Sequence, residues 1–213
     1  MPDRTFYINE KKPSACRELA KTLQTCIRKI DRPWDELVFL CVGSDRITGD
    51  SLGPLCGHQL SRYIWKNSYV YGTLDQPVHA LNLLETKQWI SVRHPHCLMI
   101  AIDASLGSRQ HLGYITAGVG SITPGAGVQK DLPEIGDIFI TGIVNLSGTF
   151  EHFMLQTTRL SFIMGMADTI TLGILMAFSM MPEKNYFYRK NEFTDKIRWA
   201  AADQGAAAFS LEG

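Results

Sequence analysis

The chain has 213 residues with 21 basic and 21 acidic side chains, so its formal net charge is zero. This balance excludes the electrostatic footprint of a nucleic-acid-binding or anionic-membrane-binding protein, and 45% hydrophobic with 20% charged residues is ordinary for a globular protein. The length supports one sizeable core. We therefore expect a single domain over 1–213, with its core at 14–181 and a C-terminal extension at 183–213.

The expected elements alternate between strands and helices. In chain order they are a polar lead-in (1–12), an amphipathic helix (16–30) with Ser14 as its N-cap, a strand (36–42), a polar loop (43–51), a helix from Leu52, a strand (68–73), a loop (74–80), a helix (83–92), a strand (97–102), a loop (104–112), a strand (113–119), a long irregular segment (121–137), a strand (138–144), a long buried helix (160–178) and a candidate helix at 197–208. Such alternation predicts a mostly parallel sheet covered on both faces.

The cysteines and the apolar segments bear on location. The five cysteines are odd in number, and no two have zinc-site or redox-motif spacing, so we expect buried thiols in a reducing cytoplasm. The first residues lack a basic segment followed by an apolar core, so no secretory signal is expected. The most apolar stretch, 161–181, carries Asp168 near its middle, which predicts a buried core helix rather than a membrane span.

Two aspartates follow predicted strands. Asp50 lies in the loop after 36–42, and Asp103 directly follows 97–102. The carboxyl ends of parallel strands meet at one edge of a sheet, so both side chains can share a cleft. Two close carboxylates do not both ionise easily, which raises the pKa of one. The ionised member could then activate a water while the protonated member polarises a scissile carbonyl. The alternative is that either aspartate only caps a helix or a turn.

The same part of the sequence does not match the known motifs for nucleotide binding or for a nucleophilic serine. A dinucleotide fingerprint starting at Gly43 needs glycine at position 45, where the carboxylate of Asp45 would repel pyrophosphate. No P-loop lysine follows, and neither Ser51 nor Ser105 has a nucleophile-elbow context.

Among the six histidines, His79 is the one expected on the same sheet edge as the aspartates, although a loop histidine more often bonds only to backbone. His94 and His96 flank Pro95 in a turn before a strand. We predict both as surface residues far from that edge.

Several segments resemble known sporulation proteins. The glycine- and aspartate-containing stretch 43–54, Ala-Ile-Asp-Ala at 101–104 and Thr-Pro-Gly-Ala-Gly-Val at 123–128 resemble, in the same order, three motifs of the bacterial spore germination protease. Segments 43–54, 71–80, 132–137 and 141–145 are similar to motifs of the YyaC-type sporulation family of candidate spore proteases. The resemblance covers roughly 36–181 and does not explain 183–213.

The resemblance implies a three-layer α/β/α sandwich of the phosphorylase/hydrolase-like type, shared with hydrogenase maturation endopeptidases. It places the germination protease's catalytic aspartates at Asp50 and Asp103; Gly49 departs from the proline usual in that protease. In the hydrogenase enzymes two carboxylates and a histidine bind nickel. The histidine position aligns with Gly125, so we expect an incomplete metal site, no bound metal and no cofactor.

The expected function is therefore that of a cytoplasmic endopeptidase in the sporulating cell or forespore, with Asp50 and Asp103 as the catalytic pair. The residues expected to line the cleft or hold the substrate backbone are Asp45, Arg46, Thr48, Asp75, His79, Pro124, Gly125 and Gly127. Expected partners are a protein or peptide substrate, with small spore proteins as candidates, and neither nucleic acid nor membrane; a homo-oligomer stays open. The alternatives are a non-catalytic sporulation protein that binds peptides in the same cleft, and a metal-dependent peptidase in which His79 replaces the missing ligand.

Overall fold

The structure is a computed structural model that describes residues 5–65, 67–124, 132–148, 150–181 and 187–189. Its helices are α1 (Ala15–Arg28), α2 (Leu52–Leu60), α3 (Leu83–Arg93), α4 (Glu151–Thr157) and α5 (Leu160–Ser179), with short 3-10 turns η1 (Thr48–Ser51) and η2 (Arg109–His111). Its strands are β1 (Phe6–Asn9), β2 (Glu36–Cys41), β3 (Tyr63–Trp65), β4 (Ser68–Tyr71), β5 (Cys97–Gly107), β6 (Tyr114–Val119), β7 (Ile138–Leu146) and β8 (Phe187–Arg189).

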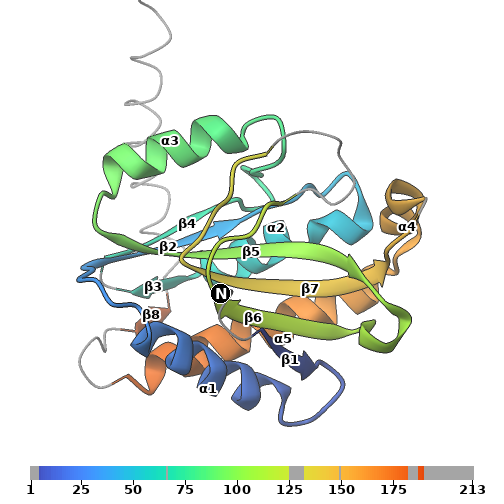
Figure 1. Ribbon diagram of the computed structural model, residues 1–213, viewed down its shortest axis with the longest axis horizontal. Coiled ribbons are helices and arrows are strands. Elements are labelled where there is room, and N and C mark those ends of the chain that lie inside the picture. Colours follow the sequence, from blue (N-terminus) through green and yellow to red (C-terminus); the bar gives the residue numbers. More distant parts are fainter. Residues whose placement is uncertain (1–4, 66, 125–131, 149, 182–186, 190–213) are drawn as a thin grey trace, which may run out of the picture.

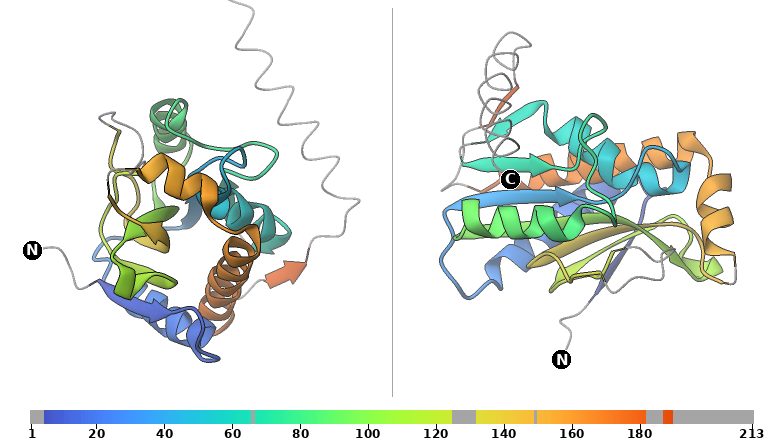
Figure 2. Two further views of the ribbon diagram at one scale, coloured as in Figure 1. Left: turned by 90° about the vertical axis from the view of Figure 1, so that its right-hand side faces the viewer. Right: turned by 90° about the horizontal axis from the view of Figure 1, so that it is seen from above.

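Six of these strands form the central sheet, in the order β1-β6-β7-β5-β2-β4. Strands β7, β5, β2 and β4 are parallel to one another, whereas β6 pairs antiparallel with β7 and β1 pairs antiparallel with β6. Helix α3 lies over one face, and α1, α2 and α5 cover the other (Figures 1 and 2). The fold is thus the expected three-layer α/β/α sandwich with a mostly parallel sheet.

Alternate residues of the buried strands supply two separate apolar clusters. On β5, Leu98, Ile100 and Ile102 pack with α1, α2 and α5 on one face of the sheet. Ala101 belongs to the smaller cluster on the other face, which α3 completes with Leu83 and Ile90. The continuous apolar runs in the sequence follow from this arrangement, because a strand covered on both faces has no polar side.

Helix α5 is the core helix of the larger cluster and packs on α1 and α2. Within the described part of the chain it is the one helix long and apolar enough to cross a membrane, by length and composition alone. Half of its most apolar window is buried inside the molecule. Packing against two other helices and the sheet therefore accounts for the apolar residues on its buried face, while Leu160, Met164 and Leu172 are exposed.

Two local expectations were wrong, and a third, the Ser14 N-cap, was confirmed in position only. The polar lead-in contains β1, in which the apolar Ile8 is buried and which pairs with β6. The strand expected to stop before Asp103 continues to Gly107, because β7 extends alongside it and supplies hydrogen-bond partners past the end of β2. Ser14 occupies the N-cap position of α1 but makes no capping bond; its hydroxyl donates to the Glu18 carboxylate at 2.6 Å. The candidate helix at 197–208 lies outside the described residues.

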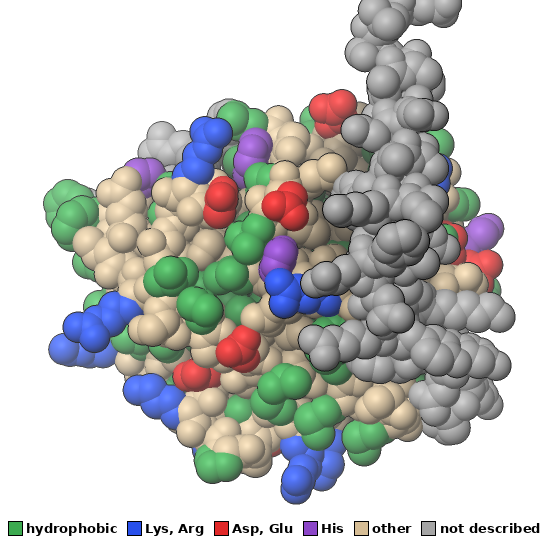
Figure 3. Space-filling view, turned by 180° about the vertical axis from the view of Figure 1, so that it is seen from behind, with side chains coloured by type: hydrophobic (Ala, Val, Ile, Leu, Met, Phe, Trp, Pro, Cys, Tyr) green, Lys and Arg blue, Asp and Glu red, His purple; other side chains and the backbone are tan. Residues whose placement is uncertain are grey.

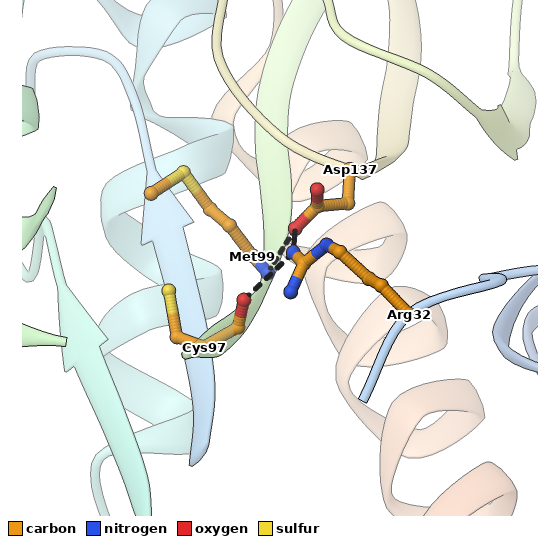
Figure 4. A network of polar contacts seen from close by, with 4 residues as sticks. All are labelled: Arg32, Cys97, Met99 and Asp137. Atoms are coloured by element: carbon orange, nitrogen blue, oxygen red, sulfur yellow. Dashed lines mark hydrogen bonds and ion pairs between the residues drawn. The ribbon is translucent and has the colours of Figure 1, made fainter. Parts of the chain in front are cut away.

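A charged contact closes the amino-terminal edge of the sheet. The Arg32 guanidinium bonds to the Asp137 carboxylate at 2.6 Å and to the Cys97 carbonyl at 2.8 Å (Figure 4). The same carboxylate accepts the backbone N–H of Met99 at 2.8 Å. Asp137 therefore fixes where β5 and β7 begin, which gives the aspartate of the segment 132–137 a structural role.

Replacing Asp137 with alanine is expected to lower the free energy of unfolding by about 1–2 kcal/mol. The change removes a charge-assisted bond and leaves the Met99 N–H without its partner, while partial exposure of the ion pair limits the loss. Urea unfolding of the variant beside wild type measures the difference. A loss below about 0.3 kcal/mol would show that solvent replaces these contacts.

Candidate functional site

At the carboxyl end of β2, glycines allow neighbouring segments of backbone to lie in direct contact. An added Cβ would lie 2.0 Å from the Val42 carbonyl oxygen at Gly53, and 2.0 Å from the Gly72 carbonyl oxygen at Gly57. At Gly72, whose φ is +84°, it would lie 1.7 Å from the Cys41 carbonyl oxygen. Part of the glycine pattern is therefore structural, because α2 can approach the sheet this closely only without side chains at these positions.

Three segments meet at this end of β2. The Val42 N–H donates to the Ile102 carbonyl on β5 at 2.7 Å, and the Gly43 N–H donates to the Val78 carbonyl after β4 at 2.8 Å. The loop 43–51, the loop after β4 and the part of β5 that carries Asp103 are thus held against one another at one edge of the parallel strands.

Asp50 sits in η1 under the short helix α4. Its backbone carbonyl accepts the N–H of Ser44 at 3.1 Å, which closes the loop on itself. Gly49, next to it, is so close to α4 that an added Cβ would lie 2.7 Å from the Leu155 carbonyl oxygen. Burial raises the pKa of the Asp50 carboxyl from 3.8 to about 6, and a backbone N–H from Ser44 opposes part of that rise. A raised carboxyl pKa was expected from like-charge repulsion with Asp103, whereas the rise at Asp50 is caused by burial and not by a neighbouring charge.

Asp50 should make the protein less stable as the pH rises. The carboxyl is protonated in both states below about pH 4, but between about pH 4 and 6 it ionises in the unfolded chain while the folded state keeps the proton. Asp50→Asn removes this penalty. The unfolding free energy of the variant relative to wild type should therefore increase by about 2–3 kcal/mol between pH 4 and 7. Urea unfolding at each pH measures it, and a constant difference would contradict the burial of this group.

Asp103 lies within β5, one residue beyond the last residue paired with β2. Its side chain is 6% exposed and accepts the backbone N–H of Ala104 at 2.8 Å. Because side chains alternate along a strand, Asp103 shares the α3 face of the sheet with Ala101. Turn η1, which carries Asp50, packs against β5.

The other predicted residues lie around the same edge at different depths. Asp45 and Arg46 are exposed, and Thr48 starts η1 and accepts the Ser51 hydroxyl at its backbone carbonyl. Asp75 is exposed in the turn that the Thr73 N–H closes on Gln76. His79 is half-buried at the entry of α3, where its Nδ1 accepts the Leu81 N–H at 3.3 Å. Pro124 is buried, while Gly125 and Gly127 lie outside the described residues.

His94 is not the surface residue predicted. It is 2% exposed, with Nδ1 at 2.9 Å from the Glu36 carboxylate and Nε2 at 2.7 Å from the Tyr71 hydroxyl. Burial raises the pKa of Tyr71 well above its ordinary value. The adjacent Pro95 and His96 are exposed, as is usual in a turn, and the prediction extended this exposure to His94. The polar partners on β2 and β4 allow a histidine to be buried there.

Sequence reasoning missed a row of hydroxyls beside Asp103. Thr141 on β7 is opposite Asp103 in the strand register, and Thr116 on β6 is opposite Thr141. The Thr116 and Thr141 hydroxyl oxygens are 2.7 Å apart, and the Ser105 hydroxyl donates to Thr141 at 3.1 Å. The available signal was polar residues inside strands that are otherwise apolar.

The described residues contain no group of three histidine, cysteine or carboxylate side chains placed to hold a metal ion. The five cysteines are free; four are buried and Cys16 is half-buried. On the face seen in Figure 3, basic and acidic side chains are scattered among apolar ones and gather into no patch of one sign.

These features define an α/β/α protein with two partly or fully buried aspartates at the carboxyl edge of its parallel strands. The chain belongs to the family described as "Protein of unknown function (DUF1256)", whose model matches residues 7–173. It is also similar to "Uncharacterized protein YyaC" of Bacillus subtilis (strain 168), with 43% identity over 169 residues that cover 79% of this chain and 81% of the relative.

Proposed function

We propose that the protein is an endopeptidase that hydrolyses peptide bonds with Asp50 and Asp103. The observation that carries the proposal is the placement of two carboxyls away from bulk solvent at one sheet edge, where η1 with Asp50 packs against β5 with Asp103. Burial raises the pKa of Asp50 to about 6, so we assign Asp50 as the member that carries the proton and Asp103, which accepts the Ala104 N–H, as the ionised member. A protonated and an ionised carboxyl together are what acid–base hydrolysis of an amide requires.

In this reaction the Asp103 carboxylate takes a proton from a water molecule as that water attacks the scissile carbonyl carbon. The Asp50 carboxyl donates a hydrogen bond to the carbonyl oxygen, on which negative charge develops. As the tetrahedral intermediate collapses, Asp103 passes the proton that it took from the water to the leaving amine, and both carboxyls return to their starting protonation states. The half-buried loop around η1 and the loop after β4 would contact the substrate backbone, with His79 and Thr48 among the contacts.

The resemblance to the spore germination protease supports a cytoplasmic role in sporulating cells, with small, basic spore proteins as substrates. It also supports the two aspartates as the reacting groups, because its motifs coincide with the loop 43–51 and with the strand β5.

The test is the release of new amino termini from an unfolded protein substrate between pH 4 and 8. Because activity needs one proton on the pair, the rate should fall at both ends of a bell-shaped profile. No release at any pH, combined with peptide binding, would contradict the proposal and favour a binding protein that uses the same edge.

A further inference from the structure

Four polar side chains interrupt the α3 face of the sheet in its middle strands. Asp103 and Ser105 come from β5, Thr141 from β7 and Thr116 from β6. The bond from Ser105 to Thr141 places the Thr141 side chain on the same face as residues 103 and 105. Asp103 and Thr116 are buried whereas Ser105 and Thr141 are half-buried, so the row runs between the interior and the solvent-accessible edge of this face.

The hydrogen bonds within this row do not use every hydroxyl proton, so one hydroxyl can donate to a group outside the row. Thr116 and Thr141 each carry one hydroxyl proton, but the single contact of 2.7 Å between their oxygens consumes only one of them. The Ser105 proton is shared between the Thr141 oxygen at 3.1 Å and the Gly142 carbonyl at 3.3 Å. When Thr116 donates to Thr141, the Thr141 proton remains available to a further acceptor.

We infer that Thr141 is a positioning residue for Asp103. Its hydroxyl accepts hydrogen bonds from Thr116 and Ser105 and donates its own proton toward the Asp103 carboxylate, which stabilises Asp103 as the ionised base of the pair. Asp103 is directly opposite Thr141 in the register, and its negative charge selects the orientation of the hydroxyl chain that ends in a donor. This inference rests on the proposed function and supplies a structural reason for the roles within it, with Asp103 as base and Asp50 as acid.

Other titratable groups near this part of β5 come from the elements packed around it. They are Asp50 on η1, Glu151 and His152 on α4, which packs on η1 and β7, and His79 after β4. Strands β6 and β7 bring hydroxyls and no charged side chain to the row, so removing the Thr141 hydroxyl changes hydrogen bonding without changing charge.

The test compares Thr141→Val with the conservative variant Thr141→Ser. The carboxyl ¹³C resonance of Asp103, assigned with Asp103→Asn, is titrated in each protein. Thr141→Val should raise the Asp103 pKa by about one unit, a tenfold change in proton affinity, and Thr141→Ser should restore the wild-type value. Thr171→Val is the matched control, because Thr171 is a buried threonine on α5 away from the row; it should leave the Asp103 pKa unchanged.

An unchanged Asp103 pKa in Thr141→Val would overturn the inference. Should that variant fail to fold, Ser105→Ala decides, because it removes a donor to Thr141 from a half-buried position. It should shift the pKa in the same direction, and no shift would overturn the inference. In cleavage assays, Thr141→Val should lower kcat about tenfold with little change in KM. Absence of cleavage by wild type would refute the proposed function, while the titration would still report on Thr141.

Discussion

Replacing either Asp50 or Asp103 with asparagine is expected to abolish peptide hydrolysis while leaving the protein folded. Asparagine keeps the size of the side chain but can neither hold nor accept the proton that the reaction moves. Each single variant should lose at least about 10³-fold in kcat. Neither should unfold, because Asp50→Asn removes a carboxyl whose ionisation burial opposes, and an asparagine oxygen at position 103 can still accept the Ala104 N–H.

The double variant distinguishes a catalytic unit from two separate structural residues. If the aspartates act together, the double variant should be no less active than either single variant, because losses within a catalytic set are strongly non-additive. Asp168→Asn serves as the control, since Asp168 is exposed on α5 and bonds to Gln59. Activity like wild type in either single variant would contradict the assignment, as would a large fall in melting temperature matched by the loss of activity.

Gly72→Ala is expected to lower the free energy of unfolding by about 4 kcal/mol or more, a large fraction of the stability of an ordinary domain. The new Cβ would lie 1.7 Å from the Cys41 carbonyl oxygen, which is backbone and belongs to the central strand β2. Its φ of +84° adds strain for any residue with a Cβ. Either β2 or the loop after β4 must move, and both hold the proposed site.

Gly120→Ala separates the two causes. Gly120 also has a positive φ, +124°, but an added Cβ would meet nothing within 4 Å. It should therefore show only the conformational cost, about 1–2 kcal/mol. Thermal and urea unfolding of both variants measure the contrast. Equal losses would show that the close contact at Gly72 relaxes without cost.

Much of the architecture was predictable because the core strands are apolar throughout and the helices between them are not. The runs at 36–42 and 97–102 correspond to β2 and β5, and the helix expected from Leu52 is α2. The end of β5 was not predictable, because a strand can continue through polar residues when its neighbour supplies the hydrogen bonds. Strand β1 was missed for the same reason: its stability comes from pairing with β6.

The candidate site was predictable only in part. Loops that follow parallel strands must share an edge, which is why Asp50 and Asp103 could be placed there from the sequence. Which neighbours surround them depends on register, and register depends on contacts distant in the sequence. Thr141 lies opposite Asp103 only because β7 pairs with β5, and His94 finds polar partners in the interior only because Glu36 and Tyr71 flank it.

The most direct test of the central claim is mass spectrometry of a small, basic, spore-type DNA-binding protein after incubation with wild type and with the variant that carries both Asp50→Asn and Asp103→Asn. The account predicts internal fragments, each pair rejoining at one hydrolysed peptide bond, with wild type and an intact substrate with the double variant. An intact substrate with both proteins, or the same fragments with both, would contradict it.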